Sequence, residues 1–135
     1  MKSYLPKCCM LISSIFFLNA SQAQVKENSI EHFIGTWKGS SLCQVKDSPC
    51  HDEVVVYYIT KGNTADSCII KANKIVNGVE EEMGTLYFKF AKANNELSSD
   101  AVNGKWNFKL KDGKMEGTLY ARNALYRKIE LSKIK

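Results

Sequence analysis

The chain is predicted to be an all-β protein, an antiparallel up-and-down barrel of eight strands, because regular turn signals separate segments of alternating polar and apolar residues. Alternation is clearest at 105–111, where Trp106, Phe108 and Leu110 share one face. The turn signals supply the positive φ angles that tight hairpins need. They occur at Gly62-Asn63, Asn77-Gly78, Asn94-Asn95, Asn103-Gly104, Asp112-Gly113 and Arg122-Asn123.

The segments between these turns define the expected strands. We expect them at 35–43, 53–61, 66–76, 83–90, 95–99, 104–111, 114–121 and 124–133. A meander of eight short strands closes naturally into a barrel, which removes the exposed strand edges. Its interior is just wide enough to be filled by side chains or to hold one small ligand. A two-sheet sandwich is the alternative, but it usually needs longer crossover connections.

Residues 1–23 have the pattern of a secretory signal peptide. The first seven residues contain Lys2 and Lys7 and no acidic residue, and an apolar run follows from Cys8 to Ala20. Ser21-Gln22-Ala23 then places small residues three and one positions before the expected cleavage site. The run is too short for a transmembrane helix, which needs about 20 residues. We therefore expect a single mature domain, 24–135, in the periplasm or outside the cell.

The charge of the mature chain is small. It has 17 basic and 14 acidic residues, a net charge of +3, and the lysines are scattered. No dense basic block marks a nucleic-acid or anionic-lipid surface. We therefore expect that the protein does not bind nucleic acid, has no membrane span and is a monomer.

The three cysteines of the mature chain are predicted to form one disulfide and one free thiol. If the first two strands pair about a turn near 47–48, Cys43 and Cys50 come close enough to bridge. Cys68 is placed opposite Tyr58, far from both, as a small buried residue. A metal site at Cys43, Cys50 and His51 is disfavoured by export and by the missing Cys-x-x-Cys pattern, so no metal is expected.

The segment Gly35-Thr36-Trp37 opens the first strand, and the face pattern of the last strand places Arg127 among apolar neighbours. This combination resembles the calycin group, which includes lipocalins and fatty-acid-binding proteins. The resemblance implies that Trp37 plugs the closed end of the barrel and that Arg127 packs over its ring, a cation–π contact worth about 0.5–2 kcal/mol.

The chain departs from that group in two places. Only residues 44–52 separate the first two strands, where fatty-acid-binding proteins insert a helical lid, and Arg127-Lys128-Ile129 lacks the tyrosine of their last strand. The resemblance therefore does not imply a fatty-acid site. Trp37 and Arg127 either only close the core or also line a ligand pocket.

Catalysis is not expected, and no cofactor is implied. Cys50 and His51 are neighbours, and neighbouring side chains on a strand point to opposite faces. The acidic run Glu80-Glu81-Glu82 is placed in a turn, as a solvated tip. No phosphate-binding glycine loop or zinc-binding helix motif is present. The chain is therefore predicted not to be an enzyme.

Two functions remain. The first is a carrier of a small apolar molecule with an anionic or strongly polar end, with space beside the small residues Gly39, Ser41, Gly117 and Ala121. Its candidate ligand-binding residues are Trp37, Phe88, Trp106, Phe108, Met115 and Arg127. The second is a protein-binding barrel, such as a lysozyme or peptidase inhibitor, acting through the 43–52 loop and the Glu80–Glu82 tip. An unfilled interior favours the carrier, and a solid core with ordered protruding loops favours the binder.

Overall fold

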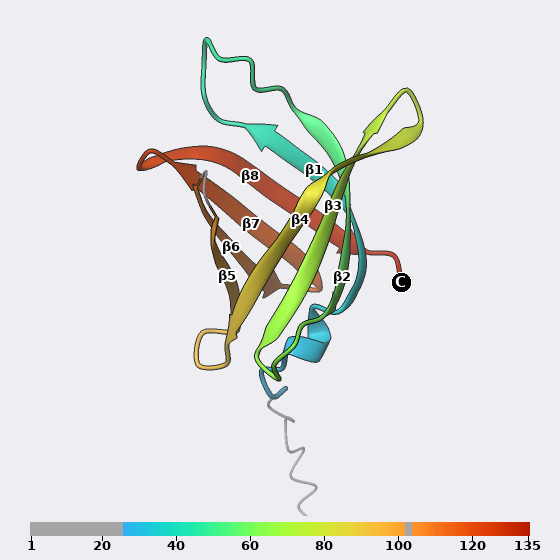
Figure 1. Cartoon of the computed structure of the whole chain (residues 1–135), viewed down its shortest axis with the longest axis vertical. Coiled ribbons are helices and arrows are strands. Elements are labelled where there is room, and N and C mark those ends of the chain that lie inside the picture. Colours follow the sequence, from blue (N-terminus) through green and yellow to red (C-terminus); the bar gives the residue numbers. More distant parts are fainter. Residues whose placement is uncertain (1–25, 102–103) are drawn as a thin grey trace, which may run out of the picture.

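The fold is a closed antiparallel barrel of eight strands in up-and-down order (Figure 1). The computed structural model describes residues 26–101 and 104–135, so the expected signal peptide 1–23 lies outside the described residues. A short 3-10 helix, η1 (Ile30–His32), precedes the barrel. The strands are β1 (Gly35–Cys43), β2 (Glu53–Lys61), β3 (Ser67–Val76), β4 (Val79–Ala91), β5 (Glu96–Ala101), β6 (Gly104–Lys111), β7 (Lys114–Ala121) and β8 (Ala124–Lys133). Strand β8 pairs with β1 and closes the barrel.

Most strands begin and end within one residue of their predicted bounds, but β4 begins earlier than expected, at Val79. The reason is the tight Asn77-Gly78 turn, whose φ angles are 51° and 78°, so that pairing continues up to Val76 opposite Val79. The placement of Glu80–Glu82 in a turn was therefore wrong, because all three residues lie in β4.

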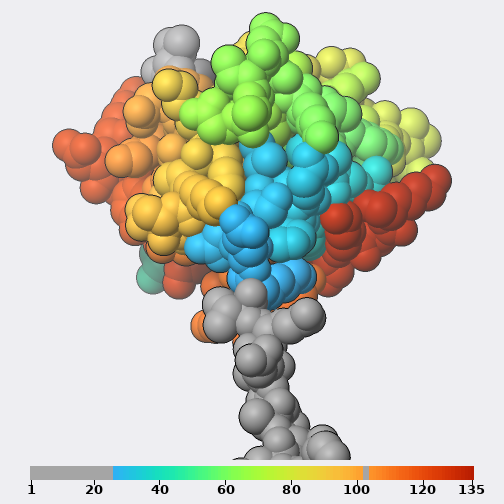
Figure 2. Space-filling view, turned by 90° about the horizontal axis from the view of Figure 1, so that it is seen from below, coloured from blue at the N-terminus to red at the C-terminus, as the bar shows by residue number. Residues whose placement is uncertain are grey.

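One end of the barrel is closed by η1 and the residues that follow it. Trp37 is 2% exposed, and its indole Nε1 donates a hydrogen bond of 2.8 Å to the Phe33 carbonyl. The Phe33 ring packs edge-on against Phe90, with centroids 5.9 Å apart. Viewed from this end, the N-terminal segment lies across the base of the barrel (Figure 2). Trp37 thus lies at the closed end, as the resemblance to the calycin group implied.

The hairpin of β3 and β4 bends over the outer face of β2. The register shifts between Ala72 and Asn73, and beyond it Glu80 accepts hydrogen bonds of 2.9 and 2.8 Å from the Tyr58 hydroxyl and 2.9 Å from Asn73 Nδ2. Val56 lies opposite Asn73 and is buried although it points outward. The cover from this hairpin explains why the run 53–60 carries the apolar Val56 on its outer face as well.

The strands β4 and β5 are paired only near the closed end. Their register covers Lys89 to Ala91 of β4, and from there the two strands diverge toward the other end (Figure 1). Within the described residues, no helix is long and apolar enough to cross a bilayer.

Candidate functional site

The end of the barrel opposite η1 is open to solvent on its inner face. Leu86 and Trp106 face inward and pack against the core, yet both are only partly buried. Phe88 and Phe108 follow them on the same faces toward the closed end and are 2% and 1% exposed. We call the space between the inner faces, from these two rings to the end opposite η1, the open half. Its walls are in contact with water, and the rings of Phe88 and Phe108 form its floor.

Arg127 points into the open half from β8. Its Nη1 donates to the His51 carbonyl at 3.0 Å, to the Ser41 hydroxyl at 3.2 Å and to the Ser41 carbonyl at 3.3 Å. The same nitrogen lies 3.4 Å from Glu53 Oε2, and the two side chains are only 13% and 21% exposed. The ion pair and these hydrogen bonds link β8 to β1, to the β1–β2 loop and to β2. Arg127 therefore holds the β1–β2 loop against the barrel.

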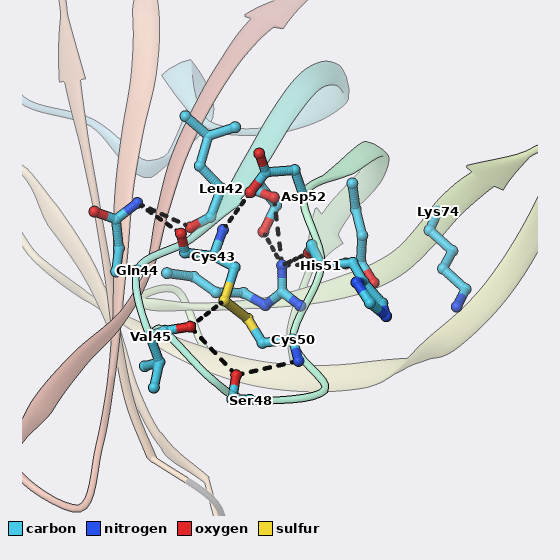
Figure 3. Close-up of polar contacts among 12 residues, drawn as sticks. Leu42, Cys43, Gln44, Val45, Ser48, Cys50, His51, Asp52 and Lys74 are labelled. Atoms are coloured by element: carbon cyan, nitrogen blue, oxygen red, sulfur yellow. Dashed lines mark hydrogen bonds and ion pairs between the residues drawn. A yellow bond between two sulfur atoms is a disulfide. The ribbon is translucent and has the colours of Figure 1, made fainter.

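The β1–β2 loop is held at several points (Figure 3). Cys43 and Cys50 form a disulfide, with Cα atoms 5.8 Å apart, which confirms the predicted pairing. Asp52 Oδ1 accepts a hydrogen bond of 2.8 Å from the Cys43 amide, and the Gln44 amide donates to the Tyr126 carbonyl at 2.9 Å. Together with Arg127, these contacts give a loop of defined shape beside the opening.

Tyr57 lies below this ion pair on the inner face of β2. It is 3% exposed, and its hydroxyl has no hydrogen-bond partner among the described residues. Burial raises the pKa of Tyr57 well above its ordinary value; the positive charge of Arg127 acts in the opposite direction, and the negative charge of Glu53 raises the pKa further. Among the described residues, the enclosed side-chain oxygens without a partner are those of Asn73 and Asn95, so the Tyr57 hydroxyl is not one of them and is reached by solvent.

The predicted ligand-binding residues divide into two groups. Phe88, Phe108 and Met115 belong to the packed core, and Trp37 to the closed end. The Phe108 ring stands at the centre, with the rings of Phe88, Tyr57 and Trp106 at centroid distances of 5.6, 6.0 and 6.3 Å. Only Trp106 and Arg127 of the predicted set face the open half.

The small residues expected to leave space do not all do so. A Cβ atom at Gly117 would overlap the Phe108 ring, and one at Gly39 would overlap the Glu130 carbonyl. Gly117 thus makes room for a ring of the protein itself, and Gly39 for the adjacent strand. The expectation of empty space at these two positions was wrong.

The expected contact between Arg127 and Trp37 is absent from the structure. In the register of β1 and β8, Lys133 lies opposite Trp37, while Arg127 lies opposite Cys43 at the other end of β1. Lys133 Nζ is 5.4 Å from the centre of the Trp37 ring. The prediction from the resemblance named the wrong cation, because a resemblance does not determine which residue of the last strand lies opposite Trp37.

Cys68 is buried and free, as predicted, but it lies opposite Lys61 and not opposite Tyr58. The turn between β2 and β3 is longer than two residues, which moves the register by three positions. Burial raises the pKa of the Cys68 thiol to about 11.

The sequence did not single out Glu53 or Tyr57. Both belong to the run that is apolar on both faces, so alternation gave no orientation for their side chains. The one usable signal was Glu53 itself, an acidic residue at the start of an apolar strand. Within the described ranges, no group of three His, Cys, Asp or Glu side chains is placed to hold a metal ion.

A second concave surface lies outside the barrel, across β5 to β8 and β1. It is an open groove of about 760 Å³ whose lining includes Glu96, Lys109 and Glu130. Lys109 pairs with Glu96 at 3.1 Å, and Lys114 pairs with Glu130 at 2.8 Å. Surface ion pairs of this kind are typical of a solvated sheet face.

No protein-family model matches this chain, and none of the curated proteins compared with it is similar in sequence. The barrel and its strand order are consistent with a calycin-like fold. That likeness concerns architecture, and architecture alone does not define a function.

Proposed function

We propose that this protein binds a small molecule in the open half of its barrel. The observation that carries the proposal is the Tyr57 hydroxyl, which makes no hydrogen bond to the described residues and is reached by solvent beside the half-buried Arg127–Glu53 pair. A ligand that accepts a hydrogen bond from Tyr57 would replace water at this hydroxyl, and an anionic acceptor would form the stronger, charge-assisted hydrogen bond.

The lining limits the ligand to a molecule with two different ends. Its polar end, a carboxylate or another strong acceptor, would meet Tyr57 and Arg127. The hydrogen bonds of Arg127 to described residues all leave from Nη1, so its Nε and Nη2 groups can donate to a ligand. The apolar body would lie on Trp106 and Leu86, above the floor of packed rings. The ligand is therefore small, because the lower half of the barrel is occupied by side chains.

Substitution of Tyr57 tests this proposal. The probe is 8-anilinonaphthalene-1-sulfonate, an apolar dye with an anionic end, titrated by fluorescence. Tyr57→Phe removes only the hydroxyl, so we expect weaker binding by about 3–10-fold, the effect of one hydrogen bond. The fold should be unharmed, because no internal partner of Tyr57 is lost.

Tyr58→Phe is the matched control. Tyr58 is the next residue on β2, but its hydroxyl is on the outer face and bonds to Glu80. We expect this variant to bind the dye as the wild type does. Absence of dye binding to the wild type, or equal binding by both tyrosine variants, would refute the proposal.

A second candidate function is protein binding at the open end. Most of the exposed large apolar side chains lie toward this end: Leu42, Val54, Val76, Val79, Met83 and Tyr120. Val79 at the β3–β4 turn is 65% exposed and Val54 is 48% exposed. A cluster of exposed apolar residues beside a loop that a disulfide holds in one shape is typical of an interaction surface. The partner would be a secreted hydrolase, such as a lysozyme or a peptidase. If the protein inhibits the activity of such an enzyme, Val79→Ser should weaken that inhibition.

We further infer that the protein acts in the periplasm or outside the cell. The disulfide fits an oxidising compartment, and the pattern of residues 1–23 fits an export signal. N-terminal sequencing of the protein from its own source should begin at Gln24. A start at Met1 would refute export by cleavage.

A further inference from the structure

We propose that Glu53 determines the charge of the ligand that the open half accepts, and that it selects one negative charge over two. This inference rests on the proposed ligand site and adds a specificity-determining residue to it. A carboxylate or a sulfonate is the accepted class of polar end, and a phosphate monoester is the rejected class.

Glu53 balances the positive charge of Arg127. The Arg127 Nη1 atom lies 3.4 Å from Glu53 Oε2, and the two side chains are 13% and 21% exposed. Because both charges are largely shielded from water, their fields are screened less than those of surface ion pairs. The hydrogen-bond acceptors that Ser41 and His51 offer to Nη1 are neutral. Glu53 is therefore the group that cancels the charge of Arg127.

Arg127 keeps donors for a ligand in spite of this pairing. Its hydrogen bonds to described residues all leave from Nη1. The enclosed side-chain atoms without a partner, among the described residues, are oxygens of Asn73 and Asn95, so Nε and Nη2 of Arg127 are reached by solvent. These two groups form one edge of the planar guanidinium, which matches an acceptor with two oxygens. A ligand bound to this edge would have only the guanidinium between its own charge and Glu53.

Both charges of the pair also act on Tyr57, which is the other donor for the polar end. Burial is the main cause of the raised pKa of Tyr57, the positive charge of Arg127 lowers the pKa, and the negative charge of Glu53 raises it further. The field of Glu53 thus extends to the place where the polar end would lie. Like charges brought together in a shielded site repel strongly, and binding sites use this repulsion to reject a ligand of the wrong charge.

The open half offers no second unbalanced cation among its described residues. Besides the Arg127–Glu53 pair, the charged side chains at its inward-facing positions are those of Lys74 and Glu81. These two lie opposite each other in β3 and β4, with Lys74 Nζ 4.0 Å from Glu81 Oε2. Residues 102 and 103, which connect β5 and β6, are uncharged in the sequence. A ligand with two negative charges would therefore meet Glu53 without a further cation to compensate.

Three probes that share a naphthalene ring test the selection. At pH 8, 1-naphthylacetamide is neutral, 1-naphthylacetate carries one negative charge, and 1-naphthyl phosphate carries two, because the second pKa of a phosphate monoester is about 6. Each probe displaces 8-anilinonaphthalene-1-sulfonate from the full mature chain. We expect the acetate to bind about threefold or more tightly than the phosphate. Tighter binding of the phosphate would overturn the proposal, and this comparison needs no variant.

Glu53→Gln keeps the shape of the side chain and removes its charge. A Coulomb energy is proportional to the charge of the ligand, so the gain in affinity for the phosphate should be the square of the gain for the acetate. We expect about tenfold against about threefold, with the amide unchanged. A variant that only loosened the rim would alter all three affinities alike. Glu53→Asp keeps the charge and should keep the ranking of the wild type. Equal effects of Glu53→Gln on the three probes would contradict the proposal.

Glu116→Gln is the control for the total charge of the chain. Glu116 is exposed on the outer face of β7, and its substitution removes the same charge as Glu53→Gln. We expect no change in any of the three affinities, and a gain for the phosphate equal to that in Glu53→Gln would overturn the proposal. Failure of the dye to bind the wild type would refute the ligand site and the role of Glu53 with it. Dye binding by the wild type without the expected effect of Glu53→Gln would refute the role of Glu53 alone.

Discussion

Lys133 Nζ lies 5.4 Å from the centre of the Trp37 ring, at the closed end of the barrel. Lys133 is the last residue of β8 and lies opposite Trp37 in the register with β1. Arg127, near the start of the same strand, binds the β1–β2 loop at the open end. Two cations of β8 thus act at opposite ends of the barrel, one over the buried indole and one at the rim of the candidate site.

A double-mutant cycle should separate these two cations. Trp37→Ala should lower the free energy of unfolding by about 3–5 kcal/mol, as expected for a buried aromatic side chain. Lys133→Met should couple with Trp37→Ala by about 0.5–1 kcal/mol, the size of an exposed cation–π contact. Arg127→Met should be additive with Trp37→Ala within about 0.5 kcal/mol, because the side chains lie far apart. Urea unfolding of the single and double variants measures both cycles, and coupling only with Arg127 would contradict the structure.

The strand pattern could be predicted because it depends on local signals. Asn77-Gly78 and Asp112-Gly113 adopt the positive φ angles expected of tight turns, and the alternation at 105–111 gave the correct inner face for Trp106 and Phe108. Such signals need only a few neighbouring residues. The barrel followed from the number of strands and the short connections between them.

The site could be predicted only in part, because it depends on register and on packing between strands. Arg127 was correctly placed inside the barrel, but its partner depends on which residue of β1 lies opposite, and no local signal sets that register. Tyr57 was missed because β2 carries apolar residues on both faces, the outer one being partly covered by the hairpin at Glu80. Alternation therefore gave no orientation for its side chains. Gly117 was misread as space, since sequence alone does not show that the Phe108 ring lies over it.

Gly117→Ala should destabilise the protein. The new methyl group would overlap the Phe108 ring, and that ring is held by Phe88, Tyr57 and Trp106. Overpacking of a core without a free direction of movement costs about 1–3 kcal/mol. The unfolding midpoint in urea measures the effect, and backbone strain does not contribute to it because Gly117 is not among the glycines with a positive φ angle. An unchanged or raised stability in Gly117→Ala would mean that empty space lies beside Phe108 after all.

Removal of the disulfide should weaken the fold and loosen the candidate rim. The Cys43–Cys50 bridge closes a short loop, so its loss through Cys43→Ser with Cys50→Ser should cost about 2–3 kcal/mol. Amides of residues 44–52 should exchange faster in this variant, while those of β6 and β7 should not. Peptide mapping of the wild type under non-reducing conditions should find Cys68 unmodified. A peptide that links Cys68 to either of the other cysteines would contradict the structure.

Stability should fall at alkaline pH because two buried groups resist ionisation. Burial raises the pKa of Cys68 to about 11 and raises the pKa of Tyr57 above its ordinary value of 10.0. When a pKa is higher in the folded state than in the unfolded chain, the stability associated with that group is fully present below the unfolded pKa. It is lost as the pH rises through the folded pKa.

For Cys68 this window begins near pH 9 and extends to about pH 11, and the loss should reach about 2–3 kcal/mol. Urea unfolding of the wild type at pH 8 and pH 11 measures the total change. The variant with both Cys68→Ala and Tyr57→Phe should lose less stability over the same interval, because neither group can ionise in its unfolded chain. Lysines contribute equally to both proteins, so the difference between the two changes isolates the buried pair. Equal losses in the two proteins would show that Cys68 and Tyr57 ionise as readily in the fold as in the unfolded chain.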